Sequence, residues 1–259
     1  MTRRKPTYKI RRYLNGNPKW VLRYQDKITY DNKKPSYILY YENGIIKEKQ
    51  WQVNNKLHRL HGPAKITYYP SGSINIEKYE RNIHTHNENE PSHIGYYEDG
   101  KIKEKAWFVD GQLYRKTGYN MIKYYPNGSI KSKAWVENGK IHRSILPAGF
   151  IYHDNKKIER IFYAKNGKMH RLNGPATIVY SENGTLEIKG WFVNGQLHRE
   201  DGPAYIKYNS NGKEICTGYY LNGIKINGKK FCSDYLKKEA SCYFDEIHLI
   251  SIISQYLIT

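Results

Sequence analysis

Apolar and polar residues alternate along short stretches of this chain. In three stretches an alanine, an isoleucine and a tyrosine stand at every second position, and the positions between them carry lysine or threonine. A period of two indicates β-strands with two different faces. The first face comprises Ala64, Ile66 and Tyr68, then Ala176, Ile178 and Tyr180, and then Ala204, Ile206 and Tyr208.

Two kinds of turn signal separate these stretches. Asn-Gly or Asp-Gly pairs such as 110–111 and 194–195 favour positive φ at both central residues, which predicts tight hairpin turns. Tyr-Pro-Ser-Gly at 69–72 and Tyr-Pro-Asn-Gly at 125–128 have proline and glycine where a β-turn places them. We therefore expect short strands joined by tight turns.

The same pattern returns every 28 residues. Seven copies fill residues 23–218 and a half copy follows, so we place the repeat domain at 23–228. One aromatic residue, called the anchor below, opens each copy, and a second aromatic residue lies 17 positions later. The anchors include Trp51, Trp107, Trp135, Tyr163 and Trp191, and the second series includes Tyr68, Tyr124, Tyr180 and Tyr208.

These features predict an all-β fold, an elongated and twisted array of stacked β-hairpin repeats. Each repeat is expected to contribute two strands and two turns, about 14 strands in all. A single hairpin is marginally stable, whereas stacked copies bury a continuous stripe. We expect the two aromatic series to form that structural core.

The two flanks depart from the repeat. Residues 1–22 hold seven cations and no acid, which predicts either a basic arm or a basic first strand. Residues 229–259 end in an apolar stripe at helical spacing, formed by Leu249, Ile252, Ile253 and Tyr256. We interpret this segment as a C-terminal helical cap over the last repeat.

Composition narrows the protein class. The 259 residues carry 43 Lys and Arg against 24 Asp and Glu, a net charge of +19. No apolar run is long enough for a transmembrane helix, and the start lacks the apolar region of a secretory signal. Three cysteines without metal-type spacing favour a reduced, intracellular setting.

Two polar columns invite chemical hypotheses. Histidine recurs seven positions after several anchors, but repeats stack about 10 Å apart whereas ligands of one ion lie about 3–4 Å apart, so we expect no metal. Arginine follows at the next position, either pairing within the repeat or forming a ladder for an anionic partner. No nucleophile, base or carboxylate pair recurs at one site, so neither catalysis nor a cofactor is expected. The arginines are Arg59, Arg115, Arg143, Arg171 and Arg199, with Arg3, Arg4, Arg11 and Arg12 in the basic flank.

The best copies contain aromatic-x-x-Asn-Gly-x-Leu-His-Arg-x-x-Gly-Pro-Ala, as at 191–204. Over about 23–225 this pattern resembles MORN-type repeats, in the longer variant of bacterial antitoxin-like proteins and giant DNA viruses. Typical MORN units are shorter and carry a Tyr-x-Gly element that this chain lacks. The resemblance implies a viral protein, located in a virion or in the host cytoplasm.

We expect a non-catalytic scaffold that binds another protein along its repeat columns, while the basic arm attracts an acidic partner. Two alternatives remain open at this point. The basic surface could bind an anionic lipid or a nucleic acid, or the chain could act as an antitoxin-like inhibitor.

Overall fold

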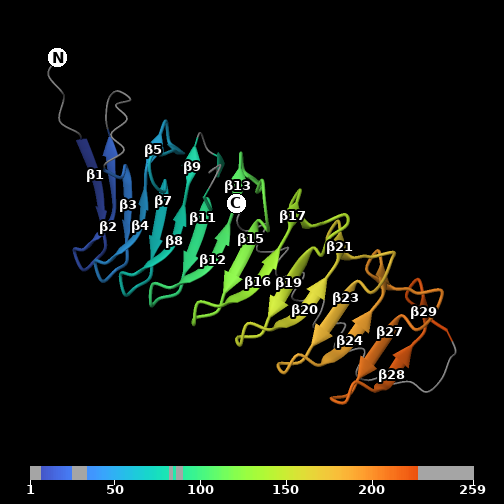
Figure 1. The fold of residues 1–259 in the computed structure, drawn as a ribbon. Helices are drawn as coiled ribbons and strands as arrows, with labels where there is room; N and C mark the ends of the chain where they lie inside the picture. The colour runs from blue at the N-terminus through green and yellow to red at the C-terminus, as the bar shows by residue number, and fades with distance from the viewer. Residues whose placement is uncertain (1–6, 25–33, 82–83, 86–89, 227–259) are drawn as a thin grey trace. The chain divides into compact units, whose positions relative to one another are not determined.

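The computed structural model describes residues 7–24, 34–81, 84–85 and 90–226 (Figure 1). This described part is all-β and contains no helix, which confirms the predicted class. The chain forms two compact units, Met1–Arg115 and Lys116–Thr259. The helical cap that we expected over 229–259 lies outside the described residues.

Long strands form an antiparallel meander in each unit, with successive strands adjacent and no crossover. The first unit contains β1 (Thr7–Arg12), β2 (Pro18–Tyr24), β3 (Tyr37–Tyr40), β4 (Ile46–Gln50), β7 (Lys65–Tyr68), β8 (Ile74–Lys78), β11 (His93–Tyr96) and β12 (Ile102–Ala106). The second contains β15 (Met121–Tyr124), β16 (Ile130–Ala134), β19 (Gly149–Tyr152), β20 (Ile158–Phe162), β23 (Thr177–Tyr180), β24 (Leu186–Gly190), β27 (Tyr205–Tyr208) and β28 (Glu214–Gly218).

A short hairpin follows each pair of long strands from β4 onward, so one repeat contains four strands rather than the expected two. The anchor tryptophan or tyrosine stands directly before this hairpin and interrupts strand pairing there. The short strands of the first unit are β5 (Gln52–Val53), β6 (Lys56–Leu57), β9 (Glu80–Arg81), β10 (His84–Thr85), β13 (Phe108–Val109) and β14 (Gln112–Leu113). Those of the second are β17 (Val136–Glu137), β18 (Lys140–Ile141), β21 (Ala164–Lys165), β22 (Lys168–Met169), β25 (Phe192–Val193), β26 (Gln196–Leu197), β29 (Tyr220–Leu221) and β30 (Ile224–Lys225).

The Asn-Gly signals lie at the tips of the short hairpins. Asn194 has φ 52° and Gly195 has φ 84°, so both central residues adopt the predicted left-handed conformation. Asn166 and Gly167 repeat this geometry at 53° and 79°. The prediction of tight hairpin turns from these dipeptides is confirmed.

The other turns connect the two long strands of each repeat. In the turn at 41–45 the Tyr41 amide donates to the Ile45 carbonyl, and the Gly44 amide donates back to Tyr41. Gly44 has φ 85°, and Lys156 adopts φ 71° at the one repeat position where glycine is missing. The strand register shifts beside each of these turns, as between Thr67 and Tyr68 just before the turn at 69–73, which is the bulge expected of such hairpins.

A tyrosine in these turns ties neighbouring repeats together. The Tyr41 hydroxyl donates to the Tyr68 carbonyl of the next repeat at 2.8 Å, and the Tyr125 hydroxyl donates to Tyr152 at the same distance. His153 takes this place in the next repeat, with Nε2 3.0 Å from the Tyr180 carbonyl. The turn pattern in the sequence did not predict these hydrogen bonds, because they join residues 27 positions apart.

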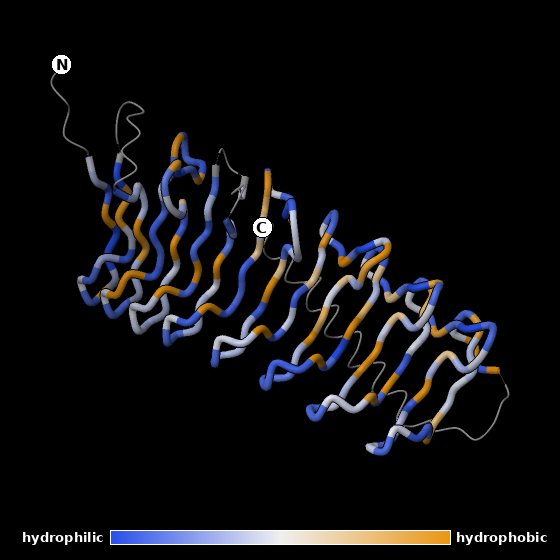
Figure 2. The backbone as a smooth tube through the Cα atoms, viewed as in Figure 1, coloured by the Kyte–Doolittle hydropathy of each residue, from blue (hydrophilic) through white to orange (hydrophobic). Residues whose placement is uncertain are grey.

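The two sheet faces of the second unit differ in burial. Along β23 the side chains of Thr177 and Val179 are buried, whereas Ile178 and Tyr180 remain partly exposed. Ile188, Tyr205 and Cys216 join Val179 in one buried cluster on the first of these faces. Apolar and polar residues alternate along the tube in Figure 2, as strands with two different faces require.

Candidate interaction surface

The repeated arginines lie on the anchor aromatic rings of their own repeats. The guanidinium carbon is 3.8 Å from the ring centroid for Arg115 on Trp107 and for Arg171 on Tyr163. Cation–π geometry of this kind suits the flat guanidinium group, which can also donate in its own plane. Arg59 on Trp51, Arg199 on Trp191 and Arg143 on Trp135 lie at 3.9, 4.1 and 5.0 Å.

Four of these guanidinium groups, those of Arg59, Arg143, Arg171 and Arg199, also donate to the carbonyl of the proline four residues later. Arg171 Nη1 lies 3.2 Å from the Pro175 carbonyl, and a Cβ on Gly174 would lie 3.4 Å from that nitrogen. That distance is an ordinary contact, so the turn needs glycine at 174 for its backbone conformation, with φ 119°. The motif Arg-x-x-Gly-Pro thus describes a structural clamp over the anchor ring, which we call the arginine clamp.

The repeat that lacks the glycine of this motif has a looser clamp. Leu146 takes the glycine position beside Arg143, and this repeat has the longest arginine–anchor distance, 5.0 Å. Arg143 also lies over Tyr119, with 5.1 Å from its guanidinium carbon to that ring. The arginine column therefore pairs within the molecule along the clamp, and a partner would meet these groups already engaged.

The basic flank is described in part. Arg11 and Arg12 lie on β1, where Arg12 Nη1 donates to the Gly16 carbonyl at 2.9 Å. Arg3 and Arg4 lie outside the described residues. The described cations of this flank are thus placed on a sheet strand.

The histidine column contacts the next short hairpin. Nδ1 of His142 lies 3.2 Å from the Asn166 amide nitrogen and 2.9 Å from the Asn166 side-chain oxygen. His170 and Asn194 repeat this arrangement. In the part of the chain described, no three His, Cys, Asp or Glu side chains cluster as metal ligands would.

The partly exposed sheet face of the second unit carries a group of aromatic and basic side chains outside the clamps. Cross-strand pairing puts Ile122, Lys133, Phe150, Ile161, Ile178 and Lys189 in one row from β15 to β24. A second row contains Tyr124, Tyr152, Tyr180 and Tyr208, two positions along their strands. All these residues are partly exposed, and we call them the aromatic–lysine face.

Lysine ammonium groups lie among the rings of this face. Lys133 Nζ is 4.9 Å from the Phe150 ring centroid and 5.3 Å from the centroids of Tyr119 and Tyr152. Phe150 and Tyr152 stack at 6.2 Å between centroids. Tyrosine and phenylalanine are enriched at protein interfaces, and here the sheet holds them in fixed rows, whereas lysine is depleted at the centre of interfaces.

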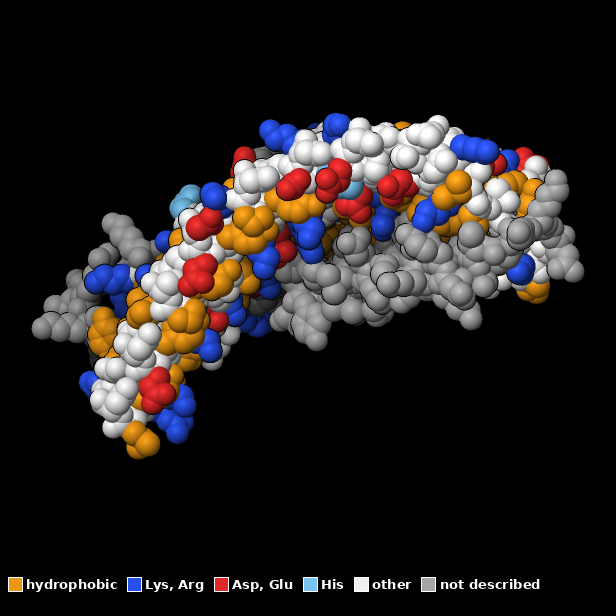
Figure 3. All heavy atoms as spheres, turned by 90° about the horizontal axis from the view of Figure 1, so that it is seen from below, with side chains coloured by type: hydrophobic (Ala, Val, Ile, Leu, Met, Phe, Trp, Pro, Cys, Tyr) orange, Lys and Arg blue, Asp and Glu red, His pale blue; other side chains and the backbone are white. Residues whose placement is uncertain are grey.

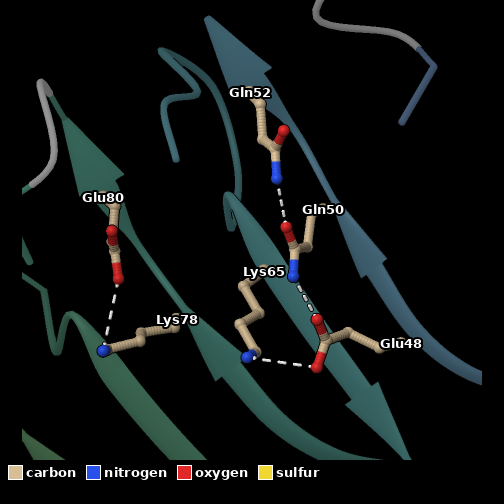
Figure 4. Close-up of polar contacts among 6 residues, drawn as sticks. All are labelled: Glu48, Gln50, Gln52, Lys65, Lys78 and Glu80. Atoms are coloured by element: carbon tan, nitrogen blue, oxygen red, sulfur yellow. Dashed lines mark hydrogen bonds and ion pairs between the residues drawn. The ribbon is translucent and has the colours of Figure 1, made fainter. Parts of the chain in front are cut away.

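In the second unit the face that contains Thr177 and Val179 is buried. At the same repeat positions the first unit carries polar side chains. Lys65 Nζ lies 3.1 Å from Glu48, and Lys78 Nζ lies 3.3 Å from Glu80. Gln50 donates to Glu48, and Gln52 donates to Gln50 along the same edge (Figure 4). These polar groups satisfy one another, so the ionic network is structural.

The view onto the turns of the long strands shows acidic, basic and hydrophobic side chains interspersed (Figure 3). Asp99 and Lys101 form one of the ion pairs in these turns, at 3.0 Å between side chains that are about half exposed. Mixed charges give little attraction for a partner of one sign. The aromatic–lysine face is therefore the better candidate for binding.

Several tyrosines of the sheets resist ionisation. The Tyr96 hydroxyl donates to Glu77 Oε2 at 2.8 Å, and burial, this hydrogen bond and the carboxylate charge raise the pKa of Tyr96 far above its usual value. Burial also raises the pKa of Tyr79 and Tyr119. In each case the folded protein favours the neutral phenol.

We expect alkaline pH to destabilise the fold. The unfolded chain loses tyrosine protons near the usual pKa of about 10, whereas the folded chain retains them, so the tyrosine contribution to stability is constant below that pH and falls above it. Urea denaturation between pH 8 and 11 measures this slope, and Tyr96→Phe should make it shallower. An equal slope in Tyr96→Phe and the unsubstituted chain would contradict the assignment to this phenol.

Comparison with known proteins adds no family assignment. No protein-family model matches the chain, and no curated protein matches it. In the described part of the chain there is no helix with the length and apolar character needed to cross a membrane.

Proposed function

We propose that the protein is a non-catalytic repeat scaffold that binds another protein through the aromatic–lysine face. The observation that carries this proposal is the contact of Lys133 with Phe150 in its own row, with Tyr152 in the second row and with the neighbouring Tyr119. Side chains in such a row are held by the sheet, so binding orders few additional rotamers. The arginine clamps and the hydrogen bonds between repeats keep that sheet rigid.

The same proposal includes the family to which the protein belongs and its location. Hairpins that recur every 28 residues support the resemblance to MORN-type repeats. That resemblance, to the variant of giant DNA viruses, supports a role in a virion or in the host cytoplasm. The helical cap over 229–259 is proposed on its apolar stripe alone.

Site-directed photo-crosslinking in the native cell tests the proposed function. A photoreactive amino acid replacing Lys189 should form an adduct with one specific protein, because Lys189 lies in the proposed face. The same amino acid at Asn211, an exposed turn residue of the same unit, is the matched control. Equal adducts at both positions, or adducts with nucleic acid or lipid only, would contradict the proposal.

We expect Phe150→Ala to weaken this crosslink strongly. An aromatic side chain at the centre of an interface contributes about 2 kcal/mol or more, which corresponds to about a 30-fold loss of affinity. Circular dichroism and the urea midpoint of the variant show whether the sheet remains intact. A folded Phe150→Ala variant that crosslinks as well as the parent would place the partner elsewhere.

A further inference from the structure

The outer edge of β1 is an open sheet edge in the part of the first unit that the structure describes. β1 stands at the end of the strand order and pairs with β2 on its inner side. Among the described residues no strand pairs with its other side. All six of its residues, Thr7–Arg12, are exposed.

The pairing on the inner side identifies the backbone groups that point outward. The Arg23 amide of β2 donates to the Ser36 carbonyl at 2.8 Å, so the backbone of Arg23 is directed toward β3. Tyr8 lies opposite Arg23, and its N–H and C=O must therefore point away from β2. By alternation the N–H and C=O of Ile10 also point to the open edge, whereas those of Lys9 and Arg11 bond to β2.

Side chains on β1 alternate in the same strict manner. Lys9 and Arg11 extend from one face, and both are exposed cations. Tyr8 and Ile10 extend from the other face, with 53% and 50% of their surfaces exposed. A strand added at this edge would meet the cations Lys9 and Arg11 on one face, and Tyr8 and Ile10 on the other, where the cation Arg12 lies beside the turn.

Equivalent positions in later repeats show how such an edge is completed. Ile10 corresponds through the 28-residue repeat to Ile38, Ile66 and Ile206. Each of these pairs with a residue of the preceding strand: Val21, Lys49 and Lys189, respectively. At β1 the chain itself supplies no such strand in its described part, although the edge keeps the geometry of the other repeats.

We propose that β1 binds an extended acidic segment of a protein partner as an added antiparallel strand. Two carboxylates of this segment lie opposite Lys9 and Arg11, and an apolar residue between them pairs with Ile10 through the outward N–H and C=O. This inference rests on the proposed function in that it assigns the chain a protein partner. Strand addition gives affinity through main-chain hydrogen bonds and specificity through alternate side chains.

Charge selects the chemistry of the occupant. The chain carries a net charge of +19, so a second copy would be repelled, whereas an acidic segment would be attracted. Cations on an edge strand also discourage pairing with a neutral strand. The alternation of cations and apolar residues on β1 favours a partner that alternates acidic and apolar residues.

The test uses the full chain and a fluorescent, end-blocked peptide, Gly-Thr-Glu-Val-Glu-Thr-Gly. Fluorescence anisotropy at low salt should show saturable binding. Methylation of the valine nitrogen removes the hydrogen-bond donor that faces Ile10, and we expect about a tenfold or greater loss of affinity. Methylation of the second glutamate nitrogen, which faces away from β1, is the matched control and should change affinity less than about threefold.

Two variants of the chain complete the test. Ile10→Pro removes the outward N–H at a position where an edge strand tolerates proline, and should weaken binding about tenfold or more. The double variant Lys9→Glu with Arg11→Glu should do the same. Lys140→Glu with Lys168→Glu makes the same change in net charge at exposed residues of the second unit and should leave binding nearly unchanged.

Three results would overturn the proposal: no binding of the parent peptide, equal binding of the two N-methylated peptides, or full binding by Ile10→Pro. The last two would reduce the interaction to charge attraction. None of these results bears on the crosslink from Lys189 in the second unit. Conversely, loss of that crosslink with intact peptide binding would reject the proposed function and leave the β1 edge as a binding site.

Discussion

Alanine in place of Gly149 is expected to destabilise the protein severely, by about 3 kcal/mol or more. A Cβ at this position would lie 2.3 Å from Phe162 Cζ and 2.6 Å from the Lys133 backbone carbonyl. Phe162 is 2% exposed and fills the space on this side of β19. Neither the buried ring nor the neighbouring strand can move away without breaking other contacts.

Gly149 occupies a repeat position that holds a side chain in other copies. His93, Met121, Thr177 and Tyr205 stand there, and all four are buried. The glycine therefore compensates for the phenylalanine opposite it, with which it pairs across β19 and β20. The two residues form one packing solution, and changing either alone creates an overlap or a cavity.

Urea denaturation followed by circular dichroism measures the effect. Gly95→Ala is the matched control, because its Cβ would lie 2.8 Å from Glu104 Cγ, part of a flexible side chain that can adjust. We expect this control to lose less than about 1 kcal/mol. Equal shifts of the urea midpoint in the two variants would show that Phe162 and its strand adapt, and would refute the packing argument.

Lysine in place of Arg171 is expected to cost about 1–2 kcal/mol although the charge is retained. The guanidinium of Arg171 combines a 3.8 Å contact with the Tyr163 ring and a hydrogen bond to the Pro175 carbonyl. A lysine ammonium cannot lie flat on the ring and donate sideways at once. Loss of stability on this substitution would thus report the geometry of the clamp rather than its charge.

A double-mutant cycle with Tyr163→Leu isolates the pair, since coupling should vanish once the ring is gone. Lys165→Arg, a change of the same two residue types at an exposed site, serves as the control and should be neutral. If Arg171→Lys were as stable as the parent, the arginine column would be available to a partner and the ladder hypothesis would regain support.

Turns and strands within each repeat are determined by residues that are close together in the sequence. Asn194 and Gly195 dictate a tight turn wherever they occur, because they adopt positive φ at little cost. The alternation in stretches such as 176–180 likewise dictates strands, and the constant period dictates that copies stack in sequence order. These features made the all-β repeat architecture predictable.

Three features needed the tertiary structure. The short hairpins, which double the number of strands per repeat, were not predicted, because two-residue strands are too brief to show a periodic pattern. The sequence did not decide whether the arginine column pairs within the repeat or forms a ladder for an anionic partner. Only the coordinates show the Arg171 guanidinium in contact with both a ring and a carbonyl. The Tyr41 hydroxyl reaches the next repeat, a contact that depends on how far apart copies stand.

The sequence by itself determined the fold class, the period and the hairpin turns, because backbone preferences and alternation act over a few residues. Only the tertiary structure decided which sheet face is buried and which presents Lys133 and Phe150, because both faces contain apolar residues. It alone also showed that β1 has no second partner strand among the described residues, since pairing between strands depends on contacts that no single segment specifies.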